Sequence, residues 1–443
     1  MRSIVGERMN LKSQIRRRGR LRAGRVRVML GLGLALPVLA ARGGDPIPPA
    51  GLEAALKNAR PGEEIVVANG AYPDSKLEIE GHGSEEAPIT VRAETPGGVV
   101  FTGESFLELK GEHVTLDGFL FEKGHSPRKA VIALEGDRCR LMNTAIDSFN
   151  PPDPEKDDKW VTLKGTRHTV ENCTFFNKTS ASVTLAVWRE SDAADHHVIA
   201  RNHFHTRPRG AKSNGYETVR IGTSDHSASA SHTTLRDNLF EACDGEMEAV
   251  SVKAGQNTIS GNTFDHCAGT LTLRHGDGTH VVGNLFAGRR KKETGGIRIY
   301  GKEHRVSGNA IIGTTGRAGG AIALMAGNPD PEPNEFHRPE KILIEKNLIV
   351  ANEGPAFLFD ALYGDDGRTE LAREVLVSVN AVSGDDLKNL FAGLDRPGLD
   401  VKLDRNQIFQ GNQIPKDITA TIAPPLTKND VGAPWFRERL PER

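Results

Sequence analysis

The chain has 443 residues and a formal net charge of −1, from 57 basic and 58 acidic residues, but residues 1–27 alone carry a net charge of +9. The remainder is therefore at about −10, which excludes a basic nucleic-acid-binding surface over the main part of the chain. Hydrophobic residues make up 37%, too few for a polytopic membrane protein but enough for a sizeable core, while 48 Gly and 5% aromatic residues favour many tight turns over a helical bundle.

Residues 1–44 have the pattern of a secretory signal and basic N-terminal extension. An Arg-rich stretch precedes the apolar run 28–41, which ends in small residues. The run is shorter than the ~20 residues that span a bilayer, so we expect a secreted or periplasmic protein with no membrane span in the mature chain. The alternative is a disordered basic tail on a cytoplasmic protein. We expect residues 45–443 to form one domain.

The first elements after this extension predict the start of a repetitive β fold. Residues 51–62 have the pattern of a short amphipathic helix that ends at Pro61 and Gly62. Such a helix would cap the open end of a solenoid, as terminal repeats require. Residues 66–72 and 89–93 predict the first strands.

One short pattern then recurs along the chain: an apolar or β-branched strand, a polar residue, and an Asn followed by apolar residues. The intervals between these Asn residues run from 22 to 38, and the longer ones fit a unit of 22–25 residues with loop insertions. A repeat in this range indicates a solenoid. The recurring residues are Asn143, Asn172, Asn202, Asn238, Asn262, Asn284, Asn309, Asn347 and Asn380.

The composition of this repeat selects the kind of solenoid. The Leu framework of leucine-rich repeats is absent, and the units are too short and too β-branched for helical repeats. We therefore predict an all-β, single-domain, right-handed parallel β-helix with loop insertions, one of them at residues 327–334. The Asn residues would stack as a ladder of side-chain amides at one corner, and would also tolerate the left-handed conformation of a sharp corner.

The four cysteines are Cys139, Cys173, Cys243 and Cys267, and their spacing fits no zinc-binding motif. Each lies in or beside a predicted strand. Free thiols in Cys are often buried, so we expect buried thiols here. A disulfide remains the alternative in an oxidising compartment.

Residues 214–301 contain the densest group of chemically active side chains. Glu246 and Glu248 share one face of a strand, whereas the apolar Val250 and Val252 are expected to point inward. Uninterrupted alternation would place Lys253 opposite the two carboxylates, so we predict a corner near residues 249–250 that reverses the alternation, as happens between the sheets of a β-helix.

The next coils extend this face with positive charge. Lys253 and Arg274 are 21 residues apart, about one coil, so we expect them on adjacent strands about 5 Å apart at the backbone, with Arg298 one coil further. Stacked like charges repel each other, and a polyanionic ligand would offset that repulsion. The alternative is a solvated ladder of ion pairs between these cations and the two Glu residues.

These segments resemble polysaccharide lyase family 6, the alginate lyase and chondroitinase B family. The resemblance covers residues from about 48 to about 385 and implies a secreted β-helical enzyme that cleaves uronate polysaccharides by β-elimination. The matching motifs are Asn214-Gly-x-Glu-x-x-Arg-Ile-Gly222, Asp244-Gly-Glu-x-Glu-x-x-Ser-x-Lys253, Leu271-Thr-Leu-Arg-His-Gly276 and Gly295-Gly-Ile-Arg-Ile-x-Gly301.

The resemblance also implies roles for individual residues, in catalytic coils at about 210–305. Family calcium ligands correspond to Asn214, Glu246 and Glu248, whose oxygen atoms suit Ca²⁺. The family's catalytic base corresponds to Lys253 and its catalytic arginine to Arg274. Ca²⁺ would bind the substrate carboxylate, Lys253 would take the C5 proton as a neutral amine, and Arg274 would assist departure of the C4 oxygen.

Four further residues are candidates for substrate contacts. Alternation points His275 inward, unless the strand ends there, and so favours a packed His over a substrate contact. Arg220 is expected to orient Glu217 or Glu246. Arg298 is a candidate clamp for a substrate carboxylate, and Tyr300 would stack on a sugar or cover the coil.

The sequence thus predicts a lyase acting on an anionic uronate polysaccharide, with alginate as the first candidate. Dermatan sulfate is the second candidate, with the same catalytic set. The alternative from another class is a non-catalytic β-helix that binds carbohydrate. A pectate-lyase-like enzyme is disfavoured, since those enzymes use Asp-rich calcium sites and an Arg base.

Overall fold

The computed structural model describes residues 44–384, 387–411 and 423–441. The chain divides into residues 1–40 and 41–443, and all described residues fall in the second unit. The predicted signal and extension, residues 1–44, lie outside the described residues except for Gly44 and stay a prediction. Among the described residues, the structure has no helix that is both long enough and apolar enough to cross a bilayer.

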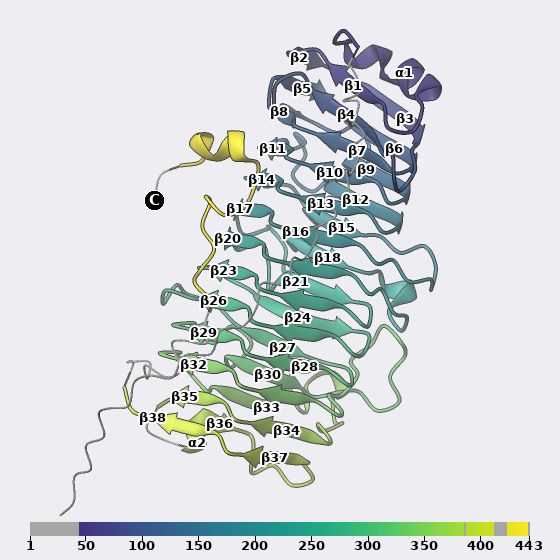
Figure 1. The fold of residues 1–443 in the computed structure, drawn as a ribbon. Helices are drawn as coiled ribbons and strands as arrows, with labels where there is room; N and C mark the ends of the chain where they lie inside the picture. The colour runs from purple at the N-terminus through teal and green to yellow at the C-terminus, as the bar shows by residue number, and fades with distance from the viewer. Residues whose placement is uncertain (1–43, 385–386, 412–422, 442–443) are drawn as a thin grey trace, which may run out of the picture. The chain divides into compact units, whose positions relative to one another are not determined.

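The described residues form a parallel β-helix, as the sequence predicts (Figure 1). Each strand pairs in parallel with the strand three places further along the chain, so that one coil contributes one strand to each of three sheets. We refer to them as sheets 1, 2 and 3.

Sheet 1 contains β1 (Glu64–Val67), β4 (Ile89–Ala93), β7 (Val114–Asp117), β10 (Arg140–Met142), β13 (Thr169–Glu171), β16 (Val198–Ala200), β19 (Thr234–Arg236), β22 (Thr258–Ser260), β25 (His280–Val282), β28 (Arg305–Ser307), β31 (Leu343–Glu345), β34 (Val375–Ser378) and β37 (Val401–Asp404). Sheet 2 contains β2 (Gly70–Pro73), β5 (Val99–Glu104), β8 (Phe119–His125), β11 (Ala145–Asp147), β14 (Thr174–Phe176), β17 (His203–Arg207), β20 (Leu239–Cys243), β23 (Thr263–Asp265), β26 (Leu285–Ala287), β29 (Ala310–Ile312), β32 (Leu348–Val350), β35 (Ala381–Ser383) and β38 (Gln407–Phe409).

Sheet 3 contains β3 (Lys76–His82), β6 (Phe106–Glu112), β9 (Ala130–Asp137), β12 (Lys159–Thr166), β15 (Leu185–Val187), β18 (Val219–Ile221), β21 (Glu248–Lys253), β24 (Thr270–His275), β27 (Ile297–Ile299), β30 (Ile322–Met325), β33 (Phe357–Ala361) and β36 (Phe391–Ala392). The helical elements are short: η1 (Pro49–Gly51), α1 (Leu52–Asn58), η2 (Ser224–His226), η3 (Asp365–Gly367), α2 (Leu387–Leu390) and η4 (Pro434–Arg439).

The predicted capping helix is present as α1, beside β1 and β3 at the first coil (Figure 1). Its apolar side chains Leu52 and Leu56 are buried and join the main core. Burying one apolar stripe of the helix in this way covers the core at the end of the solenoid. The strand predicted at residues 66–72 is wrong in detail, because a corner divides it between β1 and β2.

The predicted Asn ladder is also present, in a column between sheets 1 and 2. The Asn262 side-chain oxygen accepts hydrogen bonds from the backbone N–H and the side-chain amide of Asn238, at 3.0 and 2.9 Å. The Asn262 amide in turn donates to the side-chain oxygen of Asn284 and to the carbonyl of Leu235, both at 2.9 Å. The column runs through Asn202, Asn238, Asn262, Asn284, Asn309, Asn347, Asn380 and Asn406.

Two parts of the ladder prediction need correction. The left-handed residue is not the ladder Asn but the one before it, for example Gly261 with a φ of 64°. In the earlier coils Asn143 and Asn172 occupy this left-handed position themselves. The ladder position that follows Asn172 is taken by Cys173, whose backbone N–H donates to Asn202.

The interior of the solenoid is apolar and regularly stacked. Five Phe rings from successive coils of sheet 2 lie one above another, with centroids 4.6 to 5.0 Å apart: Phe175, Phe204, Phe240, Phe264 and Phe286. The four cysteines are buried free thiols, in agreement with the sequence, and no disulfide forms between them. Burial raises the pKa of Cys173 to about 12, so this thiol stays protonated.

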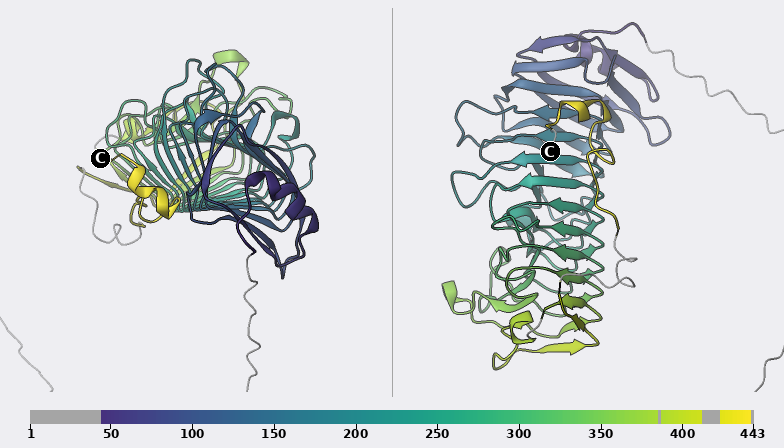
Figure 2. Two further views of the ribbon diagram at one scale, coloured as in Figure 1. Left: turned by 90° about the horizontal axis from the view of Figure 1, so that it is seen from above. Right: turned by 90° about the vertical axis from the view of Figure 1, so that its left-hand side faces the viewer.

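A C-terminal strap, residues 423–441, lies along the outer face of sheet 2 and was not predicted from the sequence (Figure 2). Its backbone N–H groups at Leu426 and Ala433 donate to Thr263 and Thr174, both at 3.0 Å. The Trp435 indole donates to the carbonyl of Asn143 at 2.7 Å. The strap thereby links coils whose strands are far apart in the sequence.

Candidate active site

The candidate catalytic residues lie on the outer side of sheet 3, where β18, β21, β24 and β27 are consecutive neighbours. In the paired register, Arg220 is aligned with Ser251, Ser251 with Thr272, and Thr272 with Arg298. The inward positions between them are Val and Ile or Leu residues that fill the core. The alternation of apolar and polar residues thus presents one column of polar side chains to the outside.

The sequence predicts a corner between sheets near residues 249–250, but both residues lie within β21, and the reversal comes instead from an interruption in the pairing of β21 with β24. Glu248 is aligned with Thr270, but the next aligned pair is Val250 with Leu271, so one residue of β21 has no partner in the ladder. A strand that skips a residue reverses the faces of all the following side chains. As a result, Lys253 lies close enough to Glu246 for its charge to oppose the rise in the pKa of Glu246.

A second interruption of the pairing lies at His275, where β24 ends, so the exception named for its inward position applies. After Val252 and Leu273, the next aligned pair is Lys253 with His275, so that β24 has one extra residue, Arg274. Such a bulge sets two residues opposite one. We therefore place Arg274 and His275 on the same outer side as Lys253, whereas strict alternation points His275 inward.

The environment of His275 agrees with this placement. The side chain is buried, and burial together with the positive charges of Arg274 and Lys253 lowers the pKa of His275 to about 3. A neutral imidazole at this position is therefore the stable form at neutral pH. Its Nδ1 atom has no hydrogen-bond partner among the described residues.

Three buried carboxylates lie beside the basic side chains of β21 and β24. They belong to Glu217, Glu246 and Glu248. Burial raises the pKa of Glu246 to about 8, and the negative charges of Glu217 and Glu248 add to this rise. The backbone N–H of Tyr216 donates to Glu246 at 3.2 Å and partly offsets it. Without a cation, this group of carboxylates holds a proton because like charges disfavour full ionisation.

Positive side chains surround the carboxylates, but at longer distances than a tight ion pair. Lys253 Nζ lies 3.9 Å and Arg220 3.8 Å from the same oxygen of Glu217. Arg274 lies 4.0 Å from Glu248. The ion-pair ladder considered from the sequence is therefore present only in part, and Lys253 pairs with Glu217 rather than with Glu246 or Glu248.

The carboxylate group fits a calcium ion on the chemistry of its donors. The second oxygen of Glu217 is buried and has no hydrogen-bond partner among the described residues. Asn214 is exposed and lies two residues before Tyr216, whose N–H contacts Glu246. Hard oxygen donors that repel one another, with an open side toward solvent, are the kind of set that Ca²⁺ prefers.

An aromatic wall from a distant loop covers the arginine side of the site. The loop between β30 and β31, where the sequence predicts an insertion, brings Phe336 over Arg274, with the guanidinium carbon 3.9 Å from the ring centroid. Arg368 lies 3.8 Å from the same centroid. This stacking restricts the orientation of Arg274, and the backbone of Gly301 holds the loop by donating to the carbonyl of His337 at 3.1 Å.

The side chains of Arg298 and Tyr300 form hydrogen bonds with other residues of the site. One guanidinium nitrogen of Arg298 lies 3.3 Å from Glu248, and the other donates to the Tyr300 hydroxyl at 2.6 Å. Tyr300 is fully buried, with its ring 5.2 Å from that of Phe336. Of the two roles considered for Tyr300, covering the coil agrees with this burial and stacking on a sugar does not. Arg298 pairs with Glu248, and its role as a clamp for a substrate carboxylate stays a prediction.

Another group that could hold a metal lies on sheet 2. His203, His205 and Glu241 place their ligand atoms within 4.8 Å of one another. The Nε2 atom of His203 is 3.0 Å from Glu241, and that of His205 is 3.8 Å from it. Two imidazoles suit zinc-like ions better than calcium, so this group differs in kind from the predicted calcium ligands.

These features define the class of protein: a parallel β-helix with acidic and basic side chains side by side on one sheet. The family model described as chondroitinase B matches residues 49–380. The chain therefore belongs to the chondroitinase B family, polysaccharide lyase family 6. A comparison with curated proteins finds no match.

Solved structures of this lyase family are similar to the chain. The alginate lyase AlyGC is 32% identical, with a TM-score of 0.80 over 88% of this chain and 58% of AlyGC, so the chain spans little more than half of that protein. A mannuronic acid specific lyase from human gut microbiota is 25% identical, with a TM-score of 0.73 over 88% of this chain and 96% of that one. An alginate lyase in complex with a trisaccharide is 27% identical, with a TM-score of 0.69 and 84% coverage of both chains.

Sequence reasoning missed two residues as parts of the site. Glu217 was considered only as a partner of Arg220, although it contacts both Arg220 and Lys253. Its position inside the Asn214 motif is a signal that could have identified it. Phe336 lies in a Pro-rich loop 62 residues after Arg274, and nothing in the local sequence connects the two.

Proposed function

We propose that this protein is a lyase that cleaves alginate by calcium-assisted β-elimination. The observation that carries the proposal is the joining of Lys253, Arg274 and His275 on adjacent strands beside the buried carboxylates. The family membership and the similarity to alginate lyases support it. We further propose that the protein is exported, with residues 1–44 as its signal and N-terminal extension.

Lys253 and Arg274 have separate roles in the proposed reaction. Lys253, as a neutral amine, accepts the proton from C5 of the uronate, and the electrons of that C–H bond form the C4–C5 double bond as the C4–O4 bond breaks. Arg274 stabilises the negative charge on the departing O4, which takes up a proton directly from the protein or through water. A new unsaturated uronate end results.

Asn214, Glu246 and Glu248 would hold calcium, with Glu217 beside them. Bound calcium would neutralise the substrate carboxylate and so make the C5 proton easier to remove. Glu217 keeps Lys253 and Arg220 in place, and Arg298 orients Glu248. Phe336 restricts the orientation of Arg274 through the stacking of its ring on the guanidinium.

Dermatan sulfate is the second candidate substrate, because the matching family model is described as chondroitinase B. Incubation with alginate, dermatan sulfate and polygalacturonate, followed by the ultraviolet absorbance of unsaturated uronates, tests both. We expect the largest increase with alginate. An increase with dermatan sulfate alone would select the second candidate, and binding of alginate without any increase would indicate a non-catalytic carbohydrate-binding protein.

A further inference from the structure

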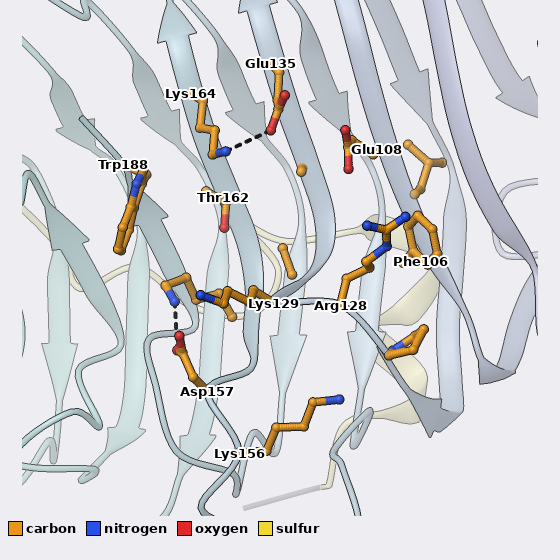
Figure 3. A pocket seen from close by; sticks show the side chains of 15 residues that line it. Phe106, Glu108, Arg128, Lys129, Glu135, Lys156, Asp157, Thr162, Lys164 and Trp188 are labelled. Carbon is orange, nitrogen blue, oxygen red and sulfur yellow. Dashed lines mark hydrogen bonds and ion pairs between the residues drawn. The ribbon is translucent and has the colours of Figure 1, made fainter. Parts of the chain in front are cut away.

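A large cavity lies on sheet 3 several coils before the candidate active site. It has a volume of about 770 Å³ and extends over β6, β9 and β12. Figure 3 shows Phe106 at one side of this cavity and Trp188, which follows β15, at the other. Because β6, β9, β12, β15, β18 and β21 are consecutive neighbours, the cavity and Lys253 lie on the same sheet.

The cavity has an excess of positive charge. Its five basic lining residues outnumber its three acidic ones: Arg128, Lys129, Lys156, Lys159 and Lys164 against Glu108, Glu135 and Asp157. Two of the acidic groups are matched by ion pairs within the cavity: Lys164 with Glu135 at 3.0 Å (Figure 3), and Lys159 with Asp157 at 2.7 Å.

Part of the remaining charge is paired with residues outside the lining. Glu108 pairs at 2.9 Å with Lys110, Arg128 pairs with Glu78, and Lys164 also lies 3.3 Å from Glu190. Lys129 is exposed, and Lys156 is partly exposed, with its amine donating to a backbone carbonyl at Ser126. Lys129 and Lys156 therefore leave the cavity positive, although the protein outside residues 1–27 is acidic. Such a site attracts anions.

Trp188 connects the cavity to the candidate active site. Its ring lies 5.0 Å from the amine of Lys159 in the cavity and 5.7 Å from the guanidinium of Arg220. Arg220 shares Glu217 with Lys253. Trp188 is partly exposed and presents apolar surface to a sugar ring, while Lys129 and Lys156 of the cavity can meet the sugar carboxylate.

The spacing of the strands sets the size of the ligand. β12 and β21 are three strand spacings apart, about 14 Å at ~4.8 Å per spacing. One sugar unit bound at Lys253 cannot reach the cavity, but a chain of several units can. We propose that this cavity is a distal subsite that binds further uronate units of the same polysaccharide chain, with Trp188 as its stacking platform. The proposal rests on the proposed function.

The test compares short and long substrates. For the double variant Lys129→Ala/Lys156→Ala, kcat/KM is measured on an alginate trisaccharide and on oligosaccharides of ten or more units. We expect the loss on the long substrate to exceed the loss on the trisaccharide by about fivefold or more, since two charge contacts are removed. The difference should shrink at high salt, which screens exposed charges.

Three further variants keep the result interpretable. Lys402→Ala removes an exposed lysine from β37 of sheet 1 and should leave the ratio between long and short substrates as in the wild type. Trp188→Ala should lower this ratio, whereas Trp188→Phe, which keeps an aromatic face, should retain most of it.

The outcomes separate this proposal from the proposed function. Equal losses on long and short substrates in both the lysine and the Trp188→Ala variants would overturn the distal subsite while leaving the lyase activity standing. A wild-type protein that cleaves no uronate polymer would instead overturn the proposed function, and the subsite with it.

Discussion

At the scale of single residues, Glu246 shows that the composition of the site has a cost in folding free energy. A buried carboxyl whose pKa is raised to about 8 by burial and by two neighbouring carboxylates is unfavourable for folding when ionised. A packed apolar side chain would avoid this cost. Under the proposed function, the physical reason to retain three carboxylates here is a cation that they would bind, and Lys253 and Arg274 beside them would act on an anionic substrate.

Replacement of Lys253 tests the proposed base. Lys253→Ala should abolish turnover and leave substrate binding largely intact, because the amine acts on the proton in the transition state. Lys253→Arg should fail as well, since a guanidinium is almost never deprotonated. Steady-state kinetics with calorimetric binding of an alginate oligosaccharide measures both. Near-normal kcat in Lys253→Ala would remove this residue as the base.

Arg274→Ala should also be nearly inactive, with the loss in kcat rather than in KM. The stacking of its guanidinium on Phe336 suggests a graded control, because Phe336→Leu keeps Arg274 but loosens its orientation. We expect Phe336→Leu to lower kcat less than Arg274→Ala does. If Arg274→Ala raised only KM, the role of Arg274 would be reduced to holding the substrate.

At the scale of elements, the Asn ladder fixes one corner of each coil. Asn262 is buried, and its side chain takes part in four hydrogen bonds along the column. Asn262→Ala removes the acceptor for the backbone N–H of Asn238, and an unsatisfied buried group costs ~1–3 kcal/mol. We expect the free energy of unfolding in urea to fall by about 3 kcal/mol. The exposed Asn429→Ala should change it little, and equal effects of both would contradict a stabilising ladder.

His304 lies at another corner of its coil and makes the stability of the fold sensitive to acid. Burial lowers the pKa of His304 to about 4. Its Nδ1 accepts from the backbone N–H of Thr279 at 3.0 Å, which only an unprotonated Nδ1 can do. Because the pKa in the unfolded chain is about 6.5, the unfolded state binds more protons as the pH falls from 6.5 toward 4. Stability is lost over this range, by about 2 kcal/mol at pH 5 for this residue.

His304→Asn tests this origin of the acid sensitivity. An Asn side chain already serves at an equivalent corner, where Asn257 accepts from the backbone N–H of Thr233 at 2.9 Å. The variant should therefore lose less stability than the wild type between pH 7 and pH 5, as measured by urea unfolding at both values. An unchanged difference between the two pH values would assign the acid sensitivity to other groups.

At the scale of the whole molecule, stability and metal binding should be separable. The coils are held by stacked strands, the Phe column and the ladder, none of which involves the carboxylates of the site. A chelator should suppress activity, and added Ca²⁺ should restore it, with the circular dichroism spectrum and the melting temperature little changed. Full activity of chelated protein that contains no metal by elemental analysis would contradict the calcium proposal.

The ligand positions can be tested in the same assay. Glu246→Gln and Glu248→Gln should each raise the Ca²⁺ concentration needed for half-maximal activity, because each removes one charge from the oxygen donors. Substrate should tighten Ca²⁺ binding in the wild type, since its carboxylate completes the coordination shell.

The sequence by itself determined the class of fold and the family. A recurring Asn every 22–38 residues, followed by apolar pairs, is a local signal, and a solenoid is built from contacts between neighbouring repeats. The motif around Lys253 and the reversal of side-chain alternation near residues 249–250 are also local in the sequence, so they too could be predicted. In a β-helix, sequence spacing converts directly into spacing between strands.

The tertiary structure decided what depends on pairing between distant segments. A single extra residue in β24 sets Arg274 and His275 on the same side, and the alternation within either strand alone gives no sign of it. The loop that brings Phe336 over Arg274 joins residues 62 positions apart. The strap, whose Trp435 donates to Asn143, joins residues 292 positions apart. Such contacts depend on where whole coils stack and loops fold back, and only the assembled sheets fix those positions.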